Sequence, residues 1–328
     1  MDLDRRAFAG LTLGLAASAL PASAALAAAA PAFRPTPYPQ RVVTLISHSS
    51  PGSGSDIFLR EMIRFLPRYI QANFIVENLD GGSGARAMLR VANARPDGSV
   101  LYATTPTLVM TSLLSKPAKT YRDVQPVVNL FTDSELVYTR IDSPLKTLAD
   151  AVERAKTQRG RWGASNPASL ERQSLEQLKL VAKVNAAVVS HEGGSDMMIN
   201  VLNGTLDLGV GETEEIRGQL DAKKVKLLAT FNAERLSSYP DVPTAKELGF
   251  DVVHQKFRGL AGPKGMPAEI LKIWEDAAQR MLADPEYKEV YERAILVPDY
   301  MPHDAYTAYI NKFAADTETY LKSVGVIR

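Results

Sequence analysis

Apolar residues along this chain recur in two alternating patterns, short continuous runs and longer stretches with helical spacing. The first run, residues 42–46, predicts a buried strand, and residues 57–69 then place Ile57, Met62 and Leu66 on one helical face. The two patterns alternate to about residue 230, and long helical stretches follow. Strands that alternate with helices predict parallel sheets flanked by helices, with ligands at the carboxyl ends of the strands.

The predicted elements form two units. Strands are predicted at residues 42–46, 73–77, 100–104, 124–131, 135–140, 161–164, 187–190, 206–210 and 225–230. Helices are predicted at residues 57–69, 85–94, 142–156, 170–182, 196–202, 214–222, 268–282, 285–294 and 303–324. Near residues 257–261 the chain is expected to return to the first unit, so lobe 1 is expected to comprise residues 38–138 and 257–328, and lobe 2 residues 139–256. Such an insertion is typical of a hinged, two-lobe binding protein.

A loop of small residues, 47–56, separates the first strand from its helix. Gly52 and Gly54 allow the backbone a positive φ or a close approach to a ligand. Ser55 or Asp56 is expected to cap the helix that follows. Free backbone N–H groups at such a helix start form a natural cradle for a carboxylate or phosphate. A similar loop precedes the helix at 170–182, and the two loops are expected to face each other.

The first 30 residues resemble an export signal rather than a folded element. Arg5 and Arg6 precede an apolar run that ends near Leu20, and small residues of the A-x-A type follow. The arginine pair is similar to a twin-arginine signal, although Asp4 stands where Ser or Thr is usual, so the general secretory route stays open. A membrane anchor is disfavoured because a span needs about 20 apolar residues.

The composition of the chain limits the kinds of binding and catalysis that it can perform. A net charge of +1, from 38 basic and 37 acidic residues, gives no indication of nucleic-acid binding. The chain has no cysteine and only four histidines, which excludes disulfides and thiolate sites and disfavours a histidine metal cluster. No G-x-S-x-G elbow or phosphate-binding G-x-G-x-x-G motif occurs in a suitable context. We therefore expect no enzymatic activity, no metal and no cofactor.

An ordered series of short motifs is similar to one known family. It comprises Tyr38-Pro39, the loop ending at Asp56, Val76-Glu-Asn78, Gly81-Gly-Ser-Gly84, Pro96-Asp-Gly98, Asn203-Gly204 with Asp207, Arg235-Leu-Ser-Ser-Tyr-Pro-Asp-Val-Pro-Thr244, and Gly259-Leu-Ala-Gly-Pro263 with Pro267. The combination resembles the Bug-type periplasmic receptors of tripartite tricarboxylate transporters and extends over the whole chain after the signal.

This resemblance implies an α/β, type II periplasmic-binding-protein fold with two lobes, each a mainly parallel sheet flanked by helices, and a ligand cleft between them. The implied function is capture of a small carboxylate in the periplasm, after cleavage of the signal, and delivery to the membrane subunits of such a transporter by a monomeric receptor. Residues carried over or assigned to the cleft are His48, Ser49, Ser50, Pro51, Gly52, Ser53, Gly54, Ser55, Asp56, Thr104, Thr105, Ser165, Asn166, Ser169, Arg172, Glu192 and Glu212.

The chain departs from the family's pattern at the mouth of the expected cleft, which leaves the ligand open. The first loop usually begins Pro-Phe-Pro-Ala-Gly-Gly, but here the sequence from His48 replaces an aromatic wall by hydroxyl groups. His48 either donates to a ligand carboxylate or packs within its own loop. Glu192 and Glu212 either recognise an amino group or are solvated or paired with Arg172 or Lys179; we favour the second interpretation.

Two functions of different class fit these observations. The first is a receptor that delivers its ligand to a transporter, and the second is a ligand-sensing partner of a membrane signalling protein. A periplasmic hydrolase is a remote third option, because Asp56 is better explained as a helix cap than as one of a pair of catalytic carboxylates.

Overall fold

The computed structural model describes residues 38–39 and 41–328. The predicted export signal, residues 1–30, lies outside these residues. Within the described part of the chain, no helix combines the length and the apolar character that a membrane span requires.

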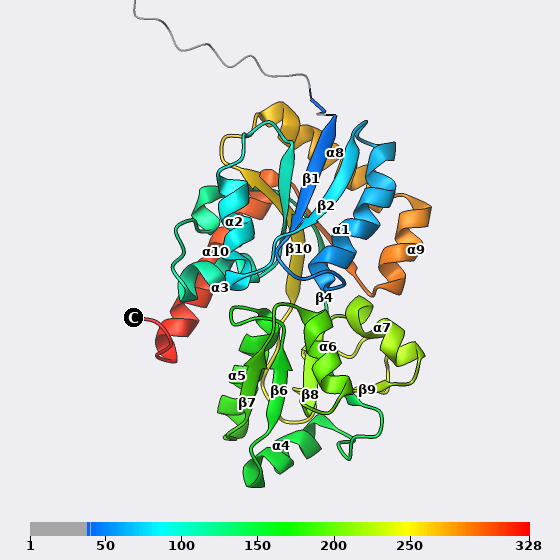
Figure 1. Cartoon of the computed structure of the whole chain (residues 1–328), viewed down its shortest axis with the longest axis vertical. Coiled ribbons are helices and arrows are strands. Elements are labelled where there is room, and N and C mark those ends of the chain that lie inside the picture. The colour runs from blue at the N-terminus through cyan, green and yellow to red at the C-terminus, as the bar shows by residue number, and fades with distance from the viewer. Residues whose placement is uncertain (1–37, 40) are drawn as a thin grey trace, which may run out of the picture. The chain divides into compact units, whose positions relative to one another are not determined.

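Lobe 1 is built on a six-stranded sheet of order β11-β4-β10-β3-β1-β2 (Figure 1). Its strands are β1 (Val42–Ser47), β2 (Asn73–Asn78), β3 (Val100–Thr104), β4 (Val124–Asp133), β10 (Lys256–Pro263) and β11 (Val297–Met301). β1 runs parallel to β2 and β3, whereas β10 runs antiparallel to β3 and β4, and β11 antiparallel to β4.

Helices cover both faces of this sheet, which explains why its central strands are apolar on both sides. They are α1 (Gly54–Phe65), α2 (Ala85–Ala92), α3 (Thr107–Leu114), α8 (Ala268–Leu282), α9 (Pro285–Arg293) and α10 (His303–Ser323). On one face Leu45 and Phe131 share a core with Leu59 of α1 and Trp274 of α8. The other face buries the strand residues Tyr102 and Phe257 with helices α2, α3 and α10.

Lobe 2 repeats this construction on a five-stranded sheet of order β7-β6-β8-β5-β9. Its strands are β5 (Leu136–Arg140), β6 (Arg161–Ala164), β7 (Ala187–Ser190), β8 (Leu208–Gly211) and β9 (Val225–Thr230). Its helices are α4 (Leu148–Thr157), α5 (Leu170–Ala182), α6 (Gly194–Leu202) and α7 (Thr213–Asp221). Trp162 is buried with α4 and α5 in one cluster, and Tyr138 with α6 and α7 in another.

The expected α/β architecture of two lobes, each with a mainly parallel sheet flanked by helices, is therefore present. The exceptions are β10 and β11 in lobe 1 and β5 in lobe 2. β10 pairs antiparallel with β3 and β4, β11 with β4, and β5 with β8 and β9. Alternating hydrophobicity predicts that a strand exists and leaves its direction in the sheet open.

The chain passes between the sheets twice. β4 ends in the first sheet at Asp133 and β5 begins in the second at Leu136, which is earlier than the expected boundary after residue 138. Only Ser134 and Glu135 separate these strands, and both are buried, so no extended surface loop marks the passage. The return lies between β9 and β10, whose first residue, Lys256, already pairs with Asp133 in the first sheet.

Helix α3 and strand β11 were absent from the sequence prediction, and β10 was expected only as a return of the chain to the first unit. Helix α3 is buried at every position from Thr107 to Ser112, so it has no polar face and no helical periodicity of hydrophobic residues. Strand β11 has the sequence Val-Pro-Asp-Tyr-Met, in which proline and aspartate interrupt the strand pattern. As an edge strand it tolerates both residues.

Candidate ligand-binding site

Helix α1 begins three residues earlier than predicted, at Gly54 instead of Ile57. Gly52 has φ +78°, and the extended Ser53 is the N-cap of a helix that starts at Gly54. The expectation that Ser55 or Asp56 caps α1 is therefore wrong, because both lie within its first turn. The Asp56 carboxylate instead accepts hydrogen bonds from the Gly52 N–H, at 2.8 Å, and from Arg60, at 2.9 Å.

The second loop, between β6 and α5, has the expected start of a helix. The Ser169 hydroxyl accepts a hydrogen bond from the backbone N–H of Arg172 at 3.2 Å, so Ser169 caps α5. Asn166 Oδ1 accepts from the backbone N–H of Ala168 at 2.9 Å and holds the turn between strand and helix. Ser165 and Asn166 are both buried, and they reach the cleft from lobe 2.

Across the cleft, the first loop contacts the start of α6. Ser50 donates to the Asp196 carboxylate at 3.0 Å, and the hydroxyls of Ser53 and Ser195 are 3.2 Å apart. Ser195 also donates to the carbonyl of Pro51 at 3.1 Å. These contacts join the two lobes directly, so the structure shows a closed cleft.

A small polar cavity lies between the two loops. Nine expected site residues line it, namely His48, Ser49, Ser53, Gly54, Ser55, Thr105, Ser165, Asn166 and Glu212. The other lining residues are Thr107, Glu171, Gly193, Gly194, Glu215 and Lys256. Its volume is about 20 Å³, which is enough for a single water molecule. An organic acid can enter only if the lobes separate.

The remaining eight expected residues lie beside this cavity or point away from it. Four of them form hydrogen bonds within the first loop or between the lobes, namely Ser50, Pro51, Gly52 and Asp56. Ser169 is occupied as a helix cap.

The last three of these residues have other partners or face solvent. The Thr104 hydroxyl lies 2.7 Å from the hydroxyl of Tyr306 in α10. Arg172 donates to Ser190 Oγ at 2.9 Å and pairs with Glu176, so its expected pairing with a glutamate of the cleft is not observed. Glu192 is exposed and is absent from the described lining of the cavity, contrary to the expectation that it faces the cleft.

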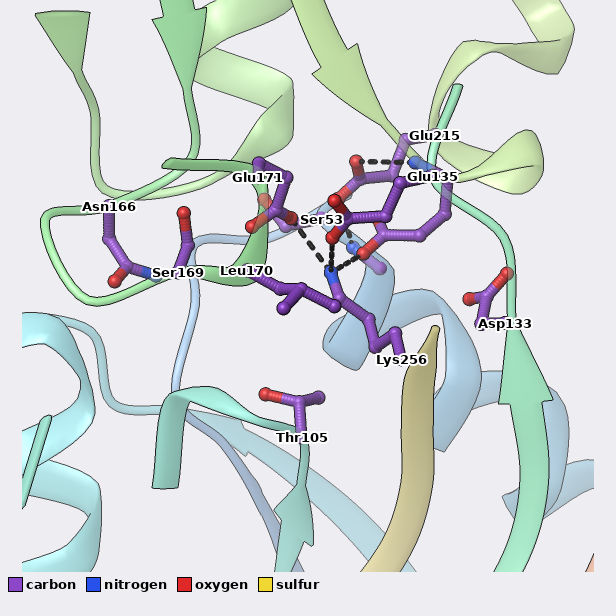
Figure 2. Close-up of polar contacts among 12 residues, drawn as sticks. Ser53, Thr105, Asp133, Glu135, Asn166, Ser169, Leu170, Glu171, Glu215 and Lys256 are labelled. Atoms are coloured by element: carbon purple, nitrogen blue, oxygen red, sulfur yellow. Dashed lines mark hydrogen bonds and ion pairs between the residues drawn. The ribbon is translucent and has the colours of Figure 1, made fainter. Parts of the chain in front are cut away.

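A network of buried charges forms one wall of the cleft. The Lys256 ammonium donates to Glu171 Oε1 at 2.7 Å and to Glu212 Oε1, and Glu135 Oε1 lies 3.6 Å away. Figure 2 shows Glu135 and Glu171 converging on this ammonium. Arg258, two residues along β10, pairs with Asp133 at 2.5 Å and with Glu212 at 3.3 Å.

The network shifts the pKa values of its members in opposite directions. Burial, together with the neighbouring Glu171, raises the pKa of Glu135 well above its usual value. Burial and the adjacent Glu212 likewise raise the pKa of Glu215. Burial also acts to raise the pKa of Glu212, but the Lys256 ammonium and Arg258 guanidinium outweigh it and lower that pKa. Glu212 is therefore ionised, whereas Glu135 and Glu215 retain protons to higher pH.

His48 occupies the lobe 1 side of the cavity. Its Nε2 is 3.4 Å from the Thr105 hydroxyl, and its ring lies against Tyr102 with centroids 5.5 Å apart. Burial and the positive charge of Lys256 lower the pKa of His48 to about 4. At neutral pH the imidazole is therefore uncharged, and its Nδ1 has no hydrogen-bond partner among the described residues.

Glu135, Glu215 and Lys256 were missed by the sequence prediction. Glu215 follows Glu212 at the spacing of a capping box, and the two side chains close such a box at the start of α7. The spacing of these two glutamates is the sequence feature from which Glu215 could have been predicted. Lys256 begins a strand whose only other charged residue is Arg258, and no acidic residue in the same strand is available to pair with either cation.

The chain belongs to the tripartite tricarboxylate transporter receptor family. The model of that family, described as "Tripartite tricarboxylate transporter family receptor", matches residues 60–326. The "UPF0065 protein in gbd 5'region" of Cupriavidus necator is 27% identical over 321 residues, which cover 96% of this chain and 93% of that protein. This family consists of periplasmic receptors and not of enzymes, in agreement with the sequence prediction.

Solved structures agree on the fold. The periplasmic binding protein BugD has a TM-score of 0.83 at 22% identity, with 88% of this chain and 99% of that chain covered. A Rhodopseudomonas palustris protein, Rpa4515, solved with adipate, has a TM-score of 0.82 at 21% identity, with 89% and 99% covered. The protein thus has the two-lobe fold of periplasmic binding proteins.

Proposed function

We propose that this protein captures a small carboxylate between its lobes and delivers it to a membrane transporter. One observation carries the proposal. Two loops from different lobes, each leading into a helix N-terminus, line a single polar cavity together with Thr105. Hydroxyl groups and backbone N–H groups at helix N-termini bind anions without a buried cation of their own.

The closed cleft supports a capture mechanism based on lobe movement. With room for about one water molecule, it excludes bulk solvent, and exclusion of solvent strengthens each hydrogen bond to a bound carboxylate. Contacts such as Ser50 to Asp196 would form when the lobes close and break when they open. The structure of a protein of the same fold with adipate supports a carboxylate as the ligand class.

The family and the N-terminal sequence support a proposal for the cellular setting. We infer that residues 1–30 direct export and are cleaved, that the mature receptor is a periplasmic monomer, and that its partners are the membrane subunits of a tripartite tricarboxylate-type transporter. The family match and the arginine pair before an apolar run support this proposal.

Ligand binding is tested by thermal denaturation of the purified protein with a panel of mono-, di- and tricarboxylates and their amino-substituted counterparts. A ligand at about 100 times its Kd adds about 2.7 kcal/mol to the free energy of unfolding and should raise Tm by about 4 °C. Ser165→Ala and Asn166→Ala should each raise Kd about five- to tenfold, since each removes one polar contact. Ser323→Ala, on the exposed end of α10, is the matched control. No shift with any compound would contradict the proposal.

Delivery requires a separate measurement. Deletion of the gene should abolish uptake of the radiolabelled ligand by intact cells, and the wild-type gene should restore uptake. Unchanged uptake with a lost transcriptional response to the ligand would instead support a sensing role.

A further inference from the structure

The wall of the cleft carries more negative than positive groups. Asp133, Glu135, Glu171 and Glu212 are at most 4% exposed, Glu215 lies beside them, and Lys256 and Arg258 supply the only cations of this network among the described residues. Two cations therefore face five carboxyl groups. Buried carboxylates need a counter-ion, hydrogen-bond donors or a proton, because an unpaired buried charge costs several kcal/mol.

The donors of the two cations do not satisfy these acceptors. The Lys256 ammonium is shared among Glu135, Glu171 and Glu212, and Arg258 is shared between Asp133 and Glu212. One oxygen in each of three carboxyl groups still has no hydrogen-bond partner among the described residues. These buried atoms are Glu135 Oε1, Glu171 Oε2 and Glu212 Oε2. Because all three groups converge on one ammonium, their unpaired oxygens belong to one small region.

The protein's own carboxylates also occupy part of the anion cradle. The Gly54 N–H, at the start of α1, donates to Glu215 Oε1 at 2.5 Å, and the Gly52 N–H donates to Asp56. A ligand with two carboxylates would place further negative charge beside these groups and would find fewer free donors in lobe 1. A positively charged ligand could instead donate hydrogen bonds to the carboxyl oxygens that have no partner among the described residues.

We propose that the ligand carries an ammonium group together with its carboxylate, and that Glu171 and Glu212 bind this ammonium. The inference rests on the proposed function and specifies its ligand class as amino-substituted carboxylates. Both glutamates line the cavity, and within the described part of the chain one oxygen of each carboxylate has no hydrogen-bond partner. Ser165, Asn166 and Thr105, which line the same cavity, hold the ligand carboxylate.

Lobe opening makes the glutamates accessible. Glu171 in α5 and Glu212 at the start of α7 belong to lobe 2, whereas Lys256 begins β10 of the lobe 1 sheet. Separation of the lobes exposes both carboxylates to the incoming ligand. When the lobes close, the ligand ammonium supplies up to three N–H donors. It supplies them to a region in which carboxyl oxygens outnumber the N–H donors of Lys256 and Arg258.

The test compares ligands that differ only in the ammonium group. Calorimetric titrations use aspartate against succinate, glutamate against glutarate, and the corresponding pairs of the panel described above. We expect the amino-substituted member of the binding pair to bind at least tenfold more tightly. Glu171→Gln should reduce this preference at least tenfold and leave binding of the unsubstituted acid equal or stronger.

Matched variants separate recognition from folding. Glu171→Asp keeps the charge and should retain most of the preference, and Glu192→Gln, an exposed glutamate after β7, should leave it unchanged. Unfolding curves of each variant establish that it is folded, and Glu212→Gln replaces Glu171→Gln if the latter does not fold. Calcium chloride alone tests whether a metal ion satisfies the carboxylates.

The outcomes distinguish the two proposals. Equal or tighter binding of the unsubstituted acids, or calcium binding that Glu171→Gln abolishes, would overturn the ammonium site and leave the receptor function standing. A panel in which no carboxylate of either kind binds would contradict the receptor function itself.

Discussion

His48 illustrates how one residue at the cleft responds to its surroundings. A histidine in an exposed loop would be partly charged near neutral pH, but burial and the nearby Lys256 ammonium keep this one neutral. A neutral imidazole can accept or donate one hydrogen bond at each nitrogen according to its tautomer. His48 packs on Tyr102 and also lines the cavity, so hydrogen bonding of its imidazole to a ligand carboxylate stays a prediction.

The lowered pKa of His48 predicts loss of stability in acid. Between pH 6.5 and about 4 the unfolded chain binds a proton at His48 that the folded protein excludes, so the free energy of unfolding falls as pH falls. The full effect is about 3 kcal/mol. Urea denaturation of wild type and His48→Gln at pH 7 and pH 4 should show their difference in stability changing by this amount, to the disadvantage of wild type in acid.

Comparing wild type with His48→Gln cancels the contributions that other titrating groups make to the free energy of unfolding. Glu135 and Glu215 have raised pKa values, so their contribution runs the opposite way, with stability lost as pH rises through the folded-state pKa. Both glutamates are present in wild type and variant, and their effects largely cancel. If the free energies of unfolding of wild type and His48→Gln changed equally with pH, the fold would not be holding His48 neutral.

At the scale of elements, the two loops start their helices by different means. Ser169 caps α5 with its side chain, whereas among the described residues Ser53 makes no such bond to α1. The Ser53 hydroxyl instead lies beside those of Ser50 and Ser195. Loop 165–169 therefore stabilises its own helix, while the first loop uses its hydroxyl for contact between lobes.

This difference predicts unequal effects of two similar substitutions. Ser169→Ala should lower the free energy of unfolding by about 1 kcal/mol, because the N–H of Arg172 loses its partner. Ser169→Asp should retain most of the stability, since aspartate is also a good N-cap. Ser53→Ala should cost less than Ser169→Ala in urea denaturation. Equal losses, or no loss at Ser169, would contradict the assignment of the caps.

At the scale of the whole molecule, the contacts between lobes define the closed state. Ser53 and Ser195 come from different lobes and their hydroxyl oxygens are 3.2 Å apart. The chain has no cysteine, so a pair of introduced cysteines can form only one intramolecular disulfide. Side chains this close are suitable for a disulfide, whose Cβ atoms lie about 3.8 Å apart.

The double variant Ser53→Cys, Ser195→Cys should lock the cleft. After oxidation, ligand binding measured by calorimetry should fall at least about tenfold, because a closed cavity of about 20 Å³ does not admit an organic acid. Reduction should restore binding, and each single cysteine variant should bind equally under both conditions. Full binding by the oxidised protein would show that ligand entry does not require the lobes to separate.

Local sequence patterns predicted much of the architecture. Strands and helices such as β3, β6, α5 and α8 lie where hydrophobic periodicity predicted them, and glycine, serine and asparagine marked the two loops that line the cavity. These features depend on local preferences, because side-chain spacing along a strand or helix decides which face is buried. The motifs along the chain also identified the family that the comparison confirms.

The electrostatics of the cleft depend on tertiary packing and could not be predicted from local sequence patterns. Lys256 meets Glu171 and Glu212 across separations of 85 and 44 residues, and no local pattern encodes such pairs. The direction of β10 and the burial of α3 also depended on packing between distant segments. A side chain's charge state follows from burial and from neighbours within a few ångströms, and here the packing of two sheets brings these neighbours together.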